Sequence, residues 1–248
     1  MNTAQRISAW RCAVVALLAC SAPLSAQPAP ELRPFKASYA ITWHGMSAGS
    51  ADLELQSMGD GRWSYTSRSF ARGLFRLAIP AELASRSIFT LRDNKIVPER
   101  FTSDDGASSA GKDQQLTFDW NRGRVTGVAE KKKVDLPTQP GLLDTMSVQV
   151  ALMHELLSGR TPQRFVLLDK DRIKEYIYTT EGSETLRTAM GEHHTVIYRS
   201  SRPGSNNGTW FWCAPDLGYL PLKVERREGK DVQWSMAVKS LAIEGVTN

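Results

Sequence analysis

A period of two in the apolar residues is the feature that most constrains how this chain can fold. In Phe35–Trp43 every second residue is apolar, and Lys36, Ser38 and Thr42 stand between them. Successive side chains of a strand point to opposite faces of a sheet, so this alternation predicts a half-buried strand. The same alternation recurs in residues 62–70, 114–120, 172–178, 195–199, 209–213, 222–226 and 231–238.

The predicted strands are separated by short segments rich in turn-forming residues. Such segments occur at 92–94, 121–123, 181–183, 203–208 and 228–230. Strands that follow one another through single turns, without helices between them, form antiparallel meanders. The pattern therefore predicts a mainly β protein in which an antiparallel meander forms a curved, partly closed, barrel-like sheet.

One segment, residues 144–158, has helical periodicity instead. Asp144 is a good N-cap residue, and Gly159 is well suited to end the helix. The apolar surface of this segment is wide and leaves only a narrow polar strip, which includes His154. We therefore predict one central helix, packed into the concave face of the sheet.

The first 26 residues have the composition of an export signal. Arg6 and Arg11 give a positive start, residues 12–19 form a short apolar core, and Ala26 ends a small-residue cleavage site. We predict cleavage after Ala26 and a periplasmic location, with residues 27–34 as an extended, Pro-rich leader.

A competing interpretation concerns Cys20. Residues 17–20 (LLAC) resemble a bacterial lipobox, in which Cys20 would be acylated and would anchor an envelope lipoprotein. Ordinary cleavage is favoured, because Leu is an unusual residue directly before the Ala of this motif. Under either hypothesis we expect a single β-rich domain over 35–241, which could divide into two lobes near 137–160, followed by a tail at 242–248.

Charge and composition exclude several classes of protein. The chain has 41% hydrophobic and 23% charged residues, which is too rich in core-forming residues for disorder. Residues 1–26 hold two Arg and no acidic residue, so the rest has 29 basic and 26 acidic residues, a net charge of +3. This mild charge argues against a nucleic-acid partner. Only Cys213 remains in the mature chain, and no stretch there reaches the ~20 apolar residues of a membrane span.

Catalytic motifs are weak. Residues 45–49 (GMSAG) match the G-x-S-x-G nucleophile elbow, which requires a strand, a turn and then a helix. The residues after Ser47 continue as a second predicted strand, so a hairpin is the favoured interpretation. We predict no catalytic residue, no metal ligands and no cofactor. A serine-dependent envelope hydrolase that uses Ser47 is kept as an alternative.

Aromatic residues in predicted strands are the better indication of function. Tyr39 and Trp43 share one face of a strand, and Trp210 and Trp212 share one face of another. Core filling is the simpler interpretation, because aromatic side chains bury a large area. The functional alternative is a concave sheet whose aromatic side chains contact a lipid or glycan. These four residues are then the candidate ligand contacts.

Several short phrases, taken in order, resemble one family. They are residues 35–43 followed by Gly45 and 48–49, then 96–98 (IVP), 116–120 (LTFDW), 143–144 with Ser147, and 212–224 (WCAPDLGYLPLKV). Together they resemble the domain of unknown function 3108 family of exported bacterial proteins, over residues 33–241. The resemblance implies an envelope β protein whose meandering, partly closed barrel wraps a helix. It implies no activity and no ligand.

The resemblance also supports structural roles for two sites. Asp144 suits the start of the helix, and residues 217–221 suit a turn that leads through Pro221 into a C-terminal strand, with Gly218 at an unusual backbone angle. Our leading hypothesis is a non-catalytic binding or carrier protein for an apolar or amphipathic envelope ligand, such as a lipid. The alternative is a structural or interaction protein of the envelope with a filled core.

Overall fold

The computed structural model describes residues 31–77, 79–107 and 111–245. The predicted export signal, including Ala26 and the alternative lipidation site Cys20, lies outside the described residues. Residues 27–30 of the predicted leader and the last three residues of the tail also lie outside them. Over the described ranges, no helix is both long enough and apolar enough to cross a membrane.

Fifteen strands form a single sheet in the part of the chain that the structure describes, which confirms the predicted mainly β class. The strands are β1 Phe35–Trp43, β2 Met46–Gly59, β3 Arg62–Ala71, β4 Leu83–Arg92, β5 Lys95–Asp104, β6 Gln114–Asp119, β7 Arg124–Ala129, β8 Lys132–Pro137, β9 Leu142–Asp144, β10 Arg164–Asp169, β11 Arg172–Thr188, β12 Gly191–Ser201, β13 Gly208–Ala214, β14 Leu220–Glu228 and β15 Asp231–Ile243. One α-helix, α1 (Ser147–Leu157), and two short 3-10 helices, η1 (Gly73–Leu77) and η2 (Pro215–Leu217), complete the described elements.

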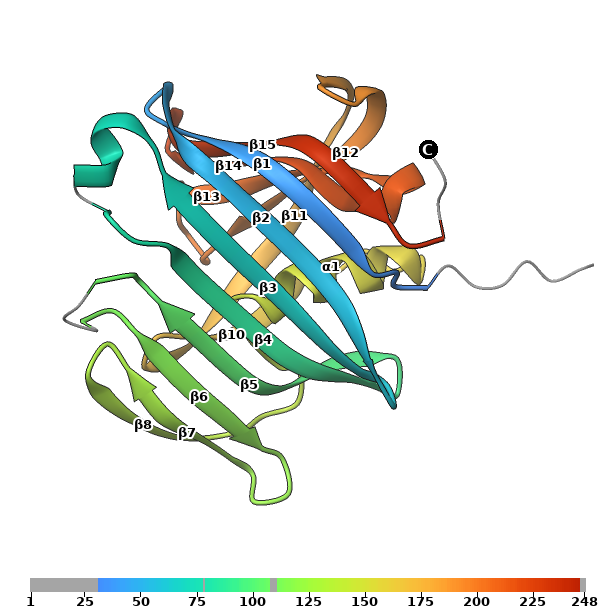
Figure 1. Ribbon diagram of the computed structural model, residues 1–248. Coiled ribbons are helices and arrows are strands. Elements are labelled where there is room, and N and C mark those ends of the chain that lie inside the picture. Colours follow the sequence, from blue (N-terminus) through green and yellow to red (C-terminus); the bar gives the residue numbers. More distant parts are fainter. Residues whose placement is uncertain (1–30, 78, 108–110, 246–248) are drawn as a thin grey trace, which may run out of the picture.

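The strands follow a meander in each half of the chain. Their order in the sheet is β8-β7-β6-β5-β4-β3-β2-β1-β15-β14-β13-β12-β11-β10-β9. All neighbours are antiparallel except β9 and β10, which are parallel. Because β1 pairs with β15, the first and last strands lie side by side in the middle of the sheet (Figure 1).

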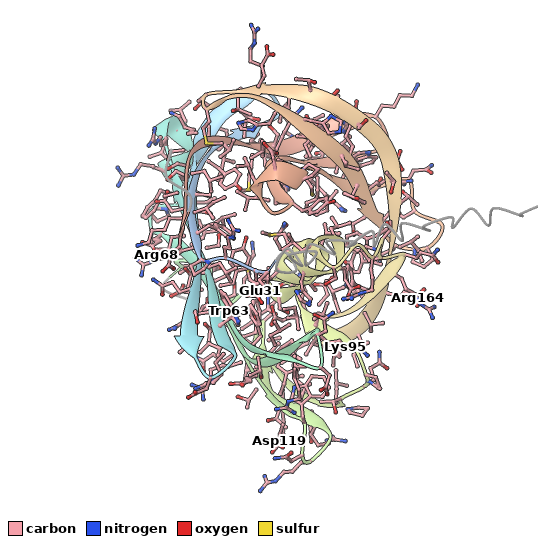
Figure 2. All side chains as sticks on the ribbon, turned by 90° about the vertical axis from the view of Figure 1, so that its right-hand side faces the viewer. Glu31, Trp63, Arg68, Lys95, Asp119 and Arg164 are labelled. Carbon is pink, nitrogen blue, oxygen red and sulfur yellow. The ribbon has the colours of Figure 1, made fainter. Side chains whose placement is uncertain are left out.

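The sheet curves around α1 without closing into a hydrogen-bonded barrel (Figures 1 and 2). Its edge strands, β8 and β9, are not paired with each other. Side chains connect the two edges instead, because Val134 of β8 and Leu142 of β9 belong to one buried cluster. An ion pair of 3.0 Å between Lys132 Nζ and Asp171 Oδ2 lies at the same seam. The result is an open, barrel-like sheet whose seam is closed by packing.

The helix begins at Ser147 rather than directly after Asp144. Asp144 is the last residue of β9, and Met146 occupies the N-cap position. The Asp144 carboxylate still serves the start of the helix, because its Oδ1 accepts hydrogen bonds from the N–H groups of Met146 (2.8 Å) and Ser147 (2.7 Å). A strand-end carboxylate thus satisfies amides that a helix leaves without partners, and this is why the sequence pattern placed the helix start too early.

Helix α1 is buried on almost all sides. Val150 and Met153 pack in the largest cluster with side chains of β1, β2 and β3, whereas Leu152 and Leu156 pack against the side chains of β11 to β13. The prediction that His154 lies in a polar strip at the helix surface is wrong. His154 is only 6% exposed, and its Nε2 lies 3.1 Å from the carbonyl oxygen of Asn94. Burial lowers the pKa of His154, so the ring is neutral at pH 7.

Candidate functional site

The four aromatic candidates lie on two different faces of the sheet. Tyr39 and Trp43 are on the concave face, on the same side of β1 as the buried core. In β13 the concave face is occupied by Phe211, which packs with the residues around α1. Trp210 and Trp212 alternate with Phe211 and therefore lie on the convex face. The structure does not bring the four together into one binding surface.

Tyr39 is part of the core. Its side chain is 1% exposed, and its hydroxyl donates a 2.8 Å hydrogen bond to the carbonyl oxygen of Pro221. Burial raises the pKa of Tyr39 well above its ordinary value. A buried phenol with a satisfied hydroxyl has no free polar group to offer a ligand.

Trp210 and Trp212 are covered by cations of the same chain. Lys223 Nζ lies 4.4 Å from the ring centre of Trp212, and the guanidinium carbon of Arg227 lies 4.7 Å from that of Trp210. Glu225 forms ion pairs with both cations. Burial alone would raise the pKa of Glu225, but the hydrogen bonds from Lys223 and Arg227 lower it below its ordinary value. This convex network satisfies itself, which leaves no open aromatic face for a ligand.

Trp43 lines an apolar recess at one end of the concave face, which we call the groove. Its volume is about 630 Å³, within the roughly 300–1,000 Å³ of small-molecule sites. The lining residues come from β1, β2, β3, β4, β15 and the segment that follows β3. They are Ile41, Trp43, Ala48, Gly49, Ser69, Phe70, Ala71, Phe75, Ile79, Leu83, Trp234 and Met236. None of these side chains is charged, and Ser69 supplies their one hydroxyl group.

The pairing of β1 with β15 builds one wall of the groove. Trp43 lies opposite Trp234, and Ile41 lies opposite Met236. Residues opposite each other in paired strands point to the same face, so the two pairs form an apolar surface on the concave side. Tyr39, at the next inward position of β1 after Ile41, already belongs to the buried core.

The segment after β3 covers the groove from outside the sheet. The N–H of Arg72 donates to the carbonyl oxygen of Ala48 (2.8 Å), which holds the start of η1 against the β1–β2 hairpin. The N–H of Ile79 donates to the carbonyl oxygen of Phe75 (2.9 Å), so the chain turns back and places both residues on the groove. Figure 1 shows η1 and the β1–β2 hairpin at the same end of the sheet.

Gly49 is required by the close approach of β2 and β3 in the groove. A Cβ atom at this position would lie 2.1 Å from the carbonyl oxygen of Phe70, a distance that real contacts do not reach. Glycine therefore allows the backbone of β3 to form the groove surface where a side chain would otherwise stand.

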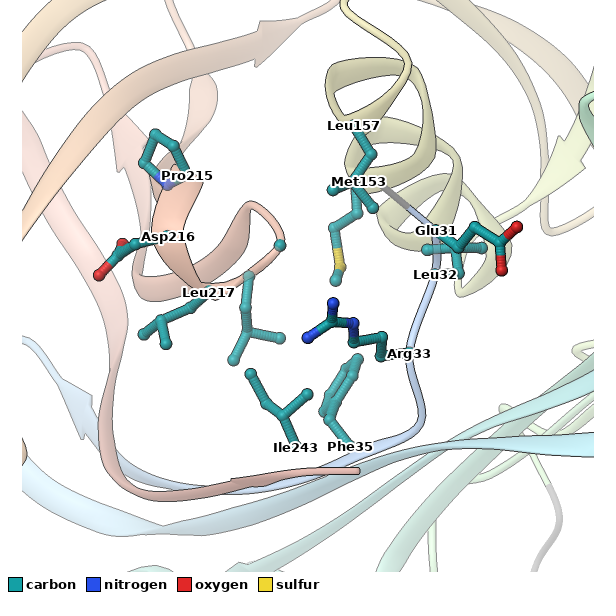
Figure 3. Close-up of a pocket in the computed structure, with 12 residues that line it drawn as sticks. Glu31, Leu32, Arg33, Phe35, Met153, Leu157, Pro215, Asp216, Leu217 and Ile243 are labelled. Carbon is teal, nitrogen blue, oxygen red and sulfur yellow. The ribbon is translucent and has the colours of Figure 1, made fainter. Parts of the chain in front are cut away.

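A second, smaller recess lies at the opposite end of the concave face, and we call it the closed-end recess (Figure 3). Its volume is about 160 Å³, and it is lined by the leader, the end of α1, η2 and the last residue of β15. Figure 3 shows the Arg33 side chain reaching into this recess, while the carboxylate of Glu31 points away from it. Its small volume and mixed lining make it a poorer ligand site than the groove.

Gly218 and Pro221 both lie beside the closed-end recess. Gly218 ends η2 in the left-handed conformation (φ 68°), and the next N–H, of Tyr219, donates to the carbonyl oxygen of Ala214 (2.8 Å). Pro221 is the second residue of β14, where its carbonyl oxygen accepts the hydroxyl of Tyr39. These contacts position the turn that carries the chain from β13 into β14.

Asp144 connects three elements inside the core. Besides the two amides at the start of α1, its Oδ2 accepts a 2.6 Å hydrogen bond from the Ser87 hydroxyl of β4. The backbone N–H of Asp144 in turn donates to Ser147 Oγ (3.0 Å). All three side chains are fully buried. Burial raises the pKa of Asp144, and these hydrogen bonds offset part of that rise.

Ser47 lies in β2, directly after the turn of the β1–β2 hairpin. A strand follows it instead of a helix, so it lacks the backbone geometry of a nucleophile elbow. The His193 ring lies in β12, five strand positions away in the sheet, and its Nδ1 is 3.4 Å from Asp216. The structure therefore does not place this histidine beside Ser47.

One group of acidic side chains in the described residues gathers closely enough to be considered for a metal. It consists of Asp104, Asp105 and Asp113, in the loop between β5 and β6. Each carboxylate already accepts a hydrogen bond from a backbone N–H of the same loop, at 2.7–3.1 Å. The three carboxylates thus hold the loop through hydrogen bonds from its own backbone.

Most of the groove was not foreseen from the sequence. Trp43 was a candidate, but its partners Trp234 and Met236 lie near the far end of the chain, and no local pattern pairs these strands. Phe75 and Ile79 lie in residues 71–81 (ARGLFRLAIPA), which hold five apolar side chains larger than Ala without the alternation of a strand. An apolar segment of this kind between two strands was the one signal that could have pointed to a cover for the groove.

Fold and groove together define an open, barrel-like antiparallel β protein that encloses one helix. The chain belongs to the family described as protein of unknown function DUF3108, whose model matches residues 38–230. This confirms the resemblance seen in the sequence. No curated protein matches the chain in sequence.

Two solved structures are similar to the chain at low sequence identity. A beta-barrel-like protein of domain of unknown function DUF1849 from Brucella abortus is 12% identical, with a TM-score of 0.57 over 87% of this chain and all of that protein. MucB, in the MucA/MucB complex of Pseudomonas aeruginosa, is 11% identical, with a TM-score of 0.40 over 89% of this chain and 55% of MucB. At this sequence identity, the similarity to the Brucella protein supports the fold and nothing about function.

Proposed function

We propose that this protein is a non-catalytic binding or carrier protein of the cell envelope, which holds an apolar or amphipathic ligand in the groove. The observation that carries the proposal is a recess of about 630 Å³ without a charged lining side chain. Burial of apolar surface is the main favourable term in such a site. The predicted export signal and periplasmic location are part of the proposal and rest on residues 1–26.

The shape of the groove supports a ligand with an apolar body and a polar end. Trp43 is 44% exposed, so the groove is open to solvent at its outer end, whereas Ile41 and Met236, further along the wall, are partly buried. An acyl chain or a similar apolar group would enter between the Ile41–Met236 wall and the cover formed by Phe75. Its polar end would remain in water beside Trp43.

The test uses a fluorescent fatty acid as a probe of the groove. We expect its fluorescence to rise and saturate on titration with the protein. Ala71→Trp places a large side chain on the concave face of the groove, and we expect it to weaken probe binding by about tenfold or more. The matched control is Ala237→Trp, on the exposed convex face of β15, which should bind the probe as the unaltered protein does.

Two outcomes would contradict the proposal. One is a folded protein that gives no response to the probe and whose native mass spectrum, after gentle purification from the envelope, contains no bound ligand. The other is covalent labelling by a fluorophosphonate that disappears in Ser47→Ala, which would favour a hydrolase.

The alternative of a structural or interaction protein is favoured by the filled centre of the sheet. Around α1 the concave face is occupied by fully buried side chains such as Leu55, Phe89 and Leu152. If the groove binds no ligand, the filled core leaves no other interior site around α1, and the protein would act through its surface.

A further inference from the structure

Four large apolar side chains stand in water at the groove end of the sheet, and we call them the rim. They are Trp43, Met46, Leu74 and Leu77. The exposed fractions of Leu74 (83%) and Leu77 (85%) are the highest among the large apolar side chains of the described residues, and Met46 is 59% exposed. Gathered apolar exposure of this kind marks an interaction site.

The rim is continuous with the groove. Trp43 belongs to both, since it lines the recess and is also 44% exposed. The other three side chains come from the β1–β2 hairpin and from η1, whose backbones are joined by the hydrogen bond from Arg72 to Ala48. Whatever surface the rim contacts therefore lies directly against the opening of the groove.

The two segments that carry the rim have charges of one sign. Residues 40–51 and 70–81 contain no acidic residue, whereas the second segment contains Arg72 and Arg76. Both arginines are exposed and form no ion pair with another described residue. The first acidic residue after the second segment, Glu82, forms an ion pair of 3.5 Å with Arg68. The segments that carry the rim are thus apolar and positively charged.

We propose that the rim docks the mouth of the groove onto the surface of an anionic lipid bilayer. Leucine side chains on turns, a tryptophan and flanking arginines are the combination that binds the boundary between headgroups and acyl chains. Each arginine near an anionic surface adds electrostatic attraction. The inference rests on the proposed function only for the reason to dock: a groove that takes apolar ligands would receive them from the bilayer.

The form of the rim favours a bilayer over a protein partner. A stable protein interface uses about 800 Å² and 20–30 residues on each side. Here four apolar side chains project from two narrow turns, and η1 has no buried residue of its own. A fluid surface accepts such separate projections without a complementary shape.

Flotation with lipid vesicles tests the proposal. We expect the protein to bind vesicles of phosphatidylglycerol and phosphatidylcholine in equal amounts more tightly than vesicles of phosphatidylcholine alone. The double variant Leu74→Asp/Leu77→Asp should bind the anionic vesicles about tenfold less tightly or weaker. Arg72→Ser and Arg76→Ser should each weaken this binding about fivefold and reduce the preference for anionic vesicles.

Strand β2 offers a matched control, because it has an exposed methionine near each end. Met46 belongs to the rim, and Met58, which is 45% exposed, lies near the other end of β2, away from the groove. Met46→Asp should weaken vesicle binding, and Met58→Asp should leave it unchanged. Equal loss in both variants, or no vesicle binding by the unaltered protein, would overturn the proposal.

Failure of docking and failure of the groove function give different results. The rim variants should still bind the fluorescent fatty acid, whereas Ala71→Trp should lose the probe and still bind vesicles. A protein that binds the probe but no vesicles keeps the proposed function and disproves docking. Light scattering that shows a dimer, lost in Leu74→Asp/Leu77→Asp without vesicle binding, would assign the rim to an interface between copies and would also disprove docking.

Discussion

The two halves of the concave face share strands, but one half is filled with side chains and the other contains an open groove. Where α1 crosses the sheet, side chains from every direction fill the space, and the closed-end recess at the end of the helix is about 160 Å³. Toward the β1–β2 hairpin no α-helix fills the concave face, and the groove of about 630 Å³ remains. The short 3-10 helices at the two ends differ in the same way, because Leu217 of η2 is half-buried while Leu74 of η1 projects into water.

One sheet can therefore supply both a stabilising core and an open site. The largest buried cluster includes side chains of α1, so we expect the end of the sheet around α1 to contribute more to stability than the groove end. Substitutions around α1 should therefore change stability, and substitutions around the groove should change binding. The three predictions below test this division, in order of decreasing effect.

The largest effect is expected at the anchor of α1. Asp144→Ala leaves the Ser87 hydroxyl and the amides of Met146 and Ser147 without their acceptor in a dry core, at a cost of about 3–5 kcal/mol in the free energy of unfolding. Urea denaturation at pH 7 measures it. The control is Asp52→Ala, since Asp52 also accepts a serine hydroxyl at 2.6 Å but is exposed. Equal losses in the two variants would contradict the role of burial.

A pair of aliphatic truncations compares the two halves directly. Leu152 of α1 is 1% exposed, so Leu152→Ala should lower the free energy of unfolding by about 2–5 kcal/mol. Ile41 is only half-buried, and Ile41→Ala should cost about 1 kcal/mol while the enlarged groove still binds the fatty-acid probe. Thermal or urea unfolding of both variants measures the contrast. A larger loss in Ile41→Ala would show that the groove end is part of the stabilising core.

The smallest effect is a dependence of stability on pH at His154. Because burial lowers its pKa, the unfolded chain binds a proton at this residue more readily than the folded protein does. Stability should therefore fall as the pH drops below the ordinary histidine pKa of about 6.5. His154→Gln, which can still donate to the carbonyl oxygen of Asn94, should lose less stability between pH 7.5 and 5. Equal slopes for the two proteins would contradict a neutral, buried His154.

The alternation of apolar residues was sufficient to predict the sheet, including the bounds of β1. It failed where strands are held by pairing alone. Strand β11 extends to Thr188 rather than ending near residue 178, because residues 179–185 have no apolar side chain and still pair with β12. For α1, periodicity located the helix, but the capping of its first amides by a strand residue could not be read from spacing.

The candidate site was only partly accessible from the sequence. Alternation placed Trp43 on the concave face, yet the same rule grouped Trp210 with Trp212 without saying which face of the sheet they share. That choice depends on the curvature of the whole sheet and on the cations of β14. Burial of His154 was equally invisible, because a helix that is enclosed on all sides has no solvent face for its polar strip.

The pairing of β1 with β15 has a consequence for when the groove forms during folding. Hairpins within each half of the chain form from contacts that are close in sequence, but this pairing joins residues separated by almost the entire described chain, and such contacts form late in folding. The Trp43–Trp234 wall belongs to that last step. A chain that has made every hairpin but has not yet joined its two ends would have most of its strands and no groove, so the capacity to bind should appear only when folding is complete.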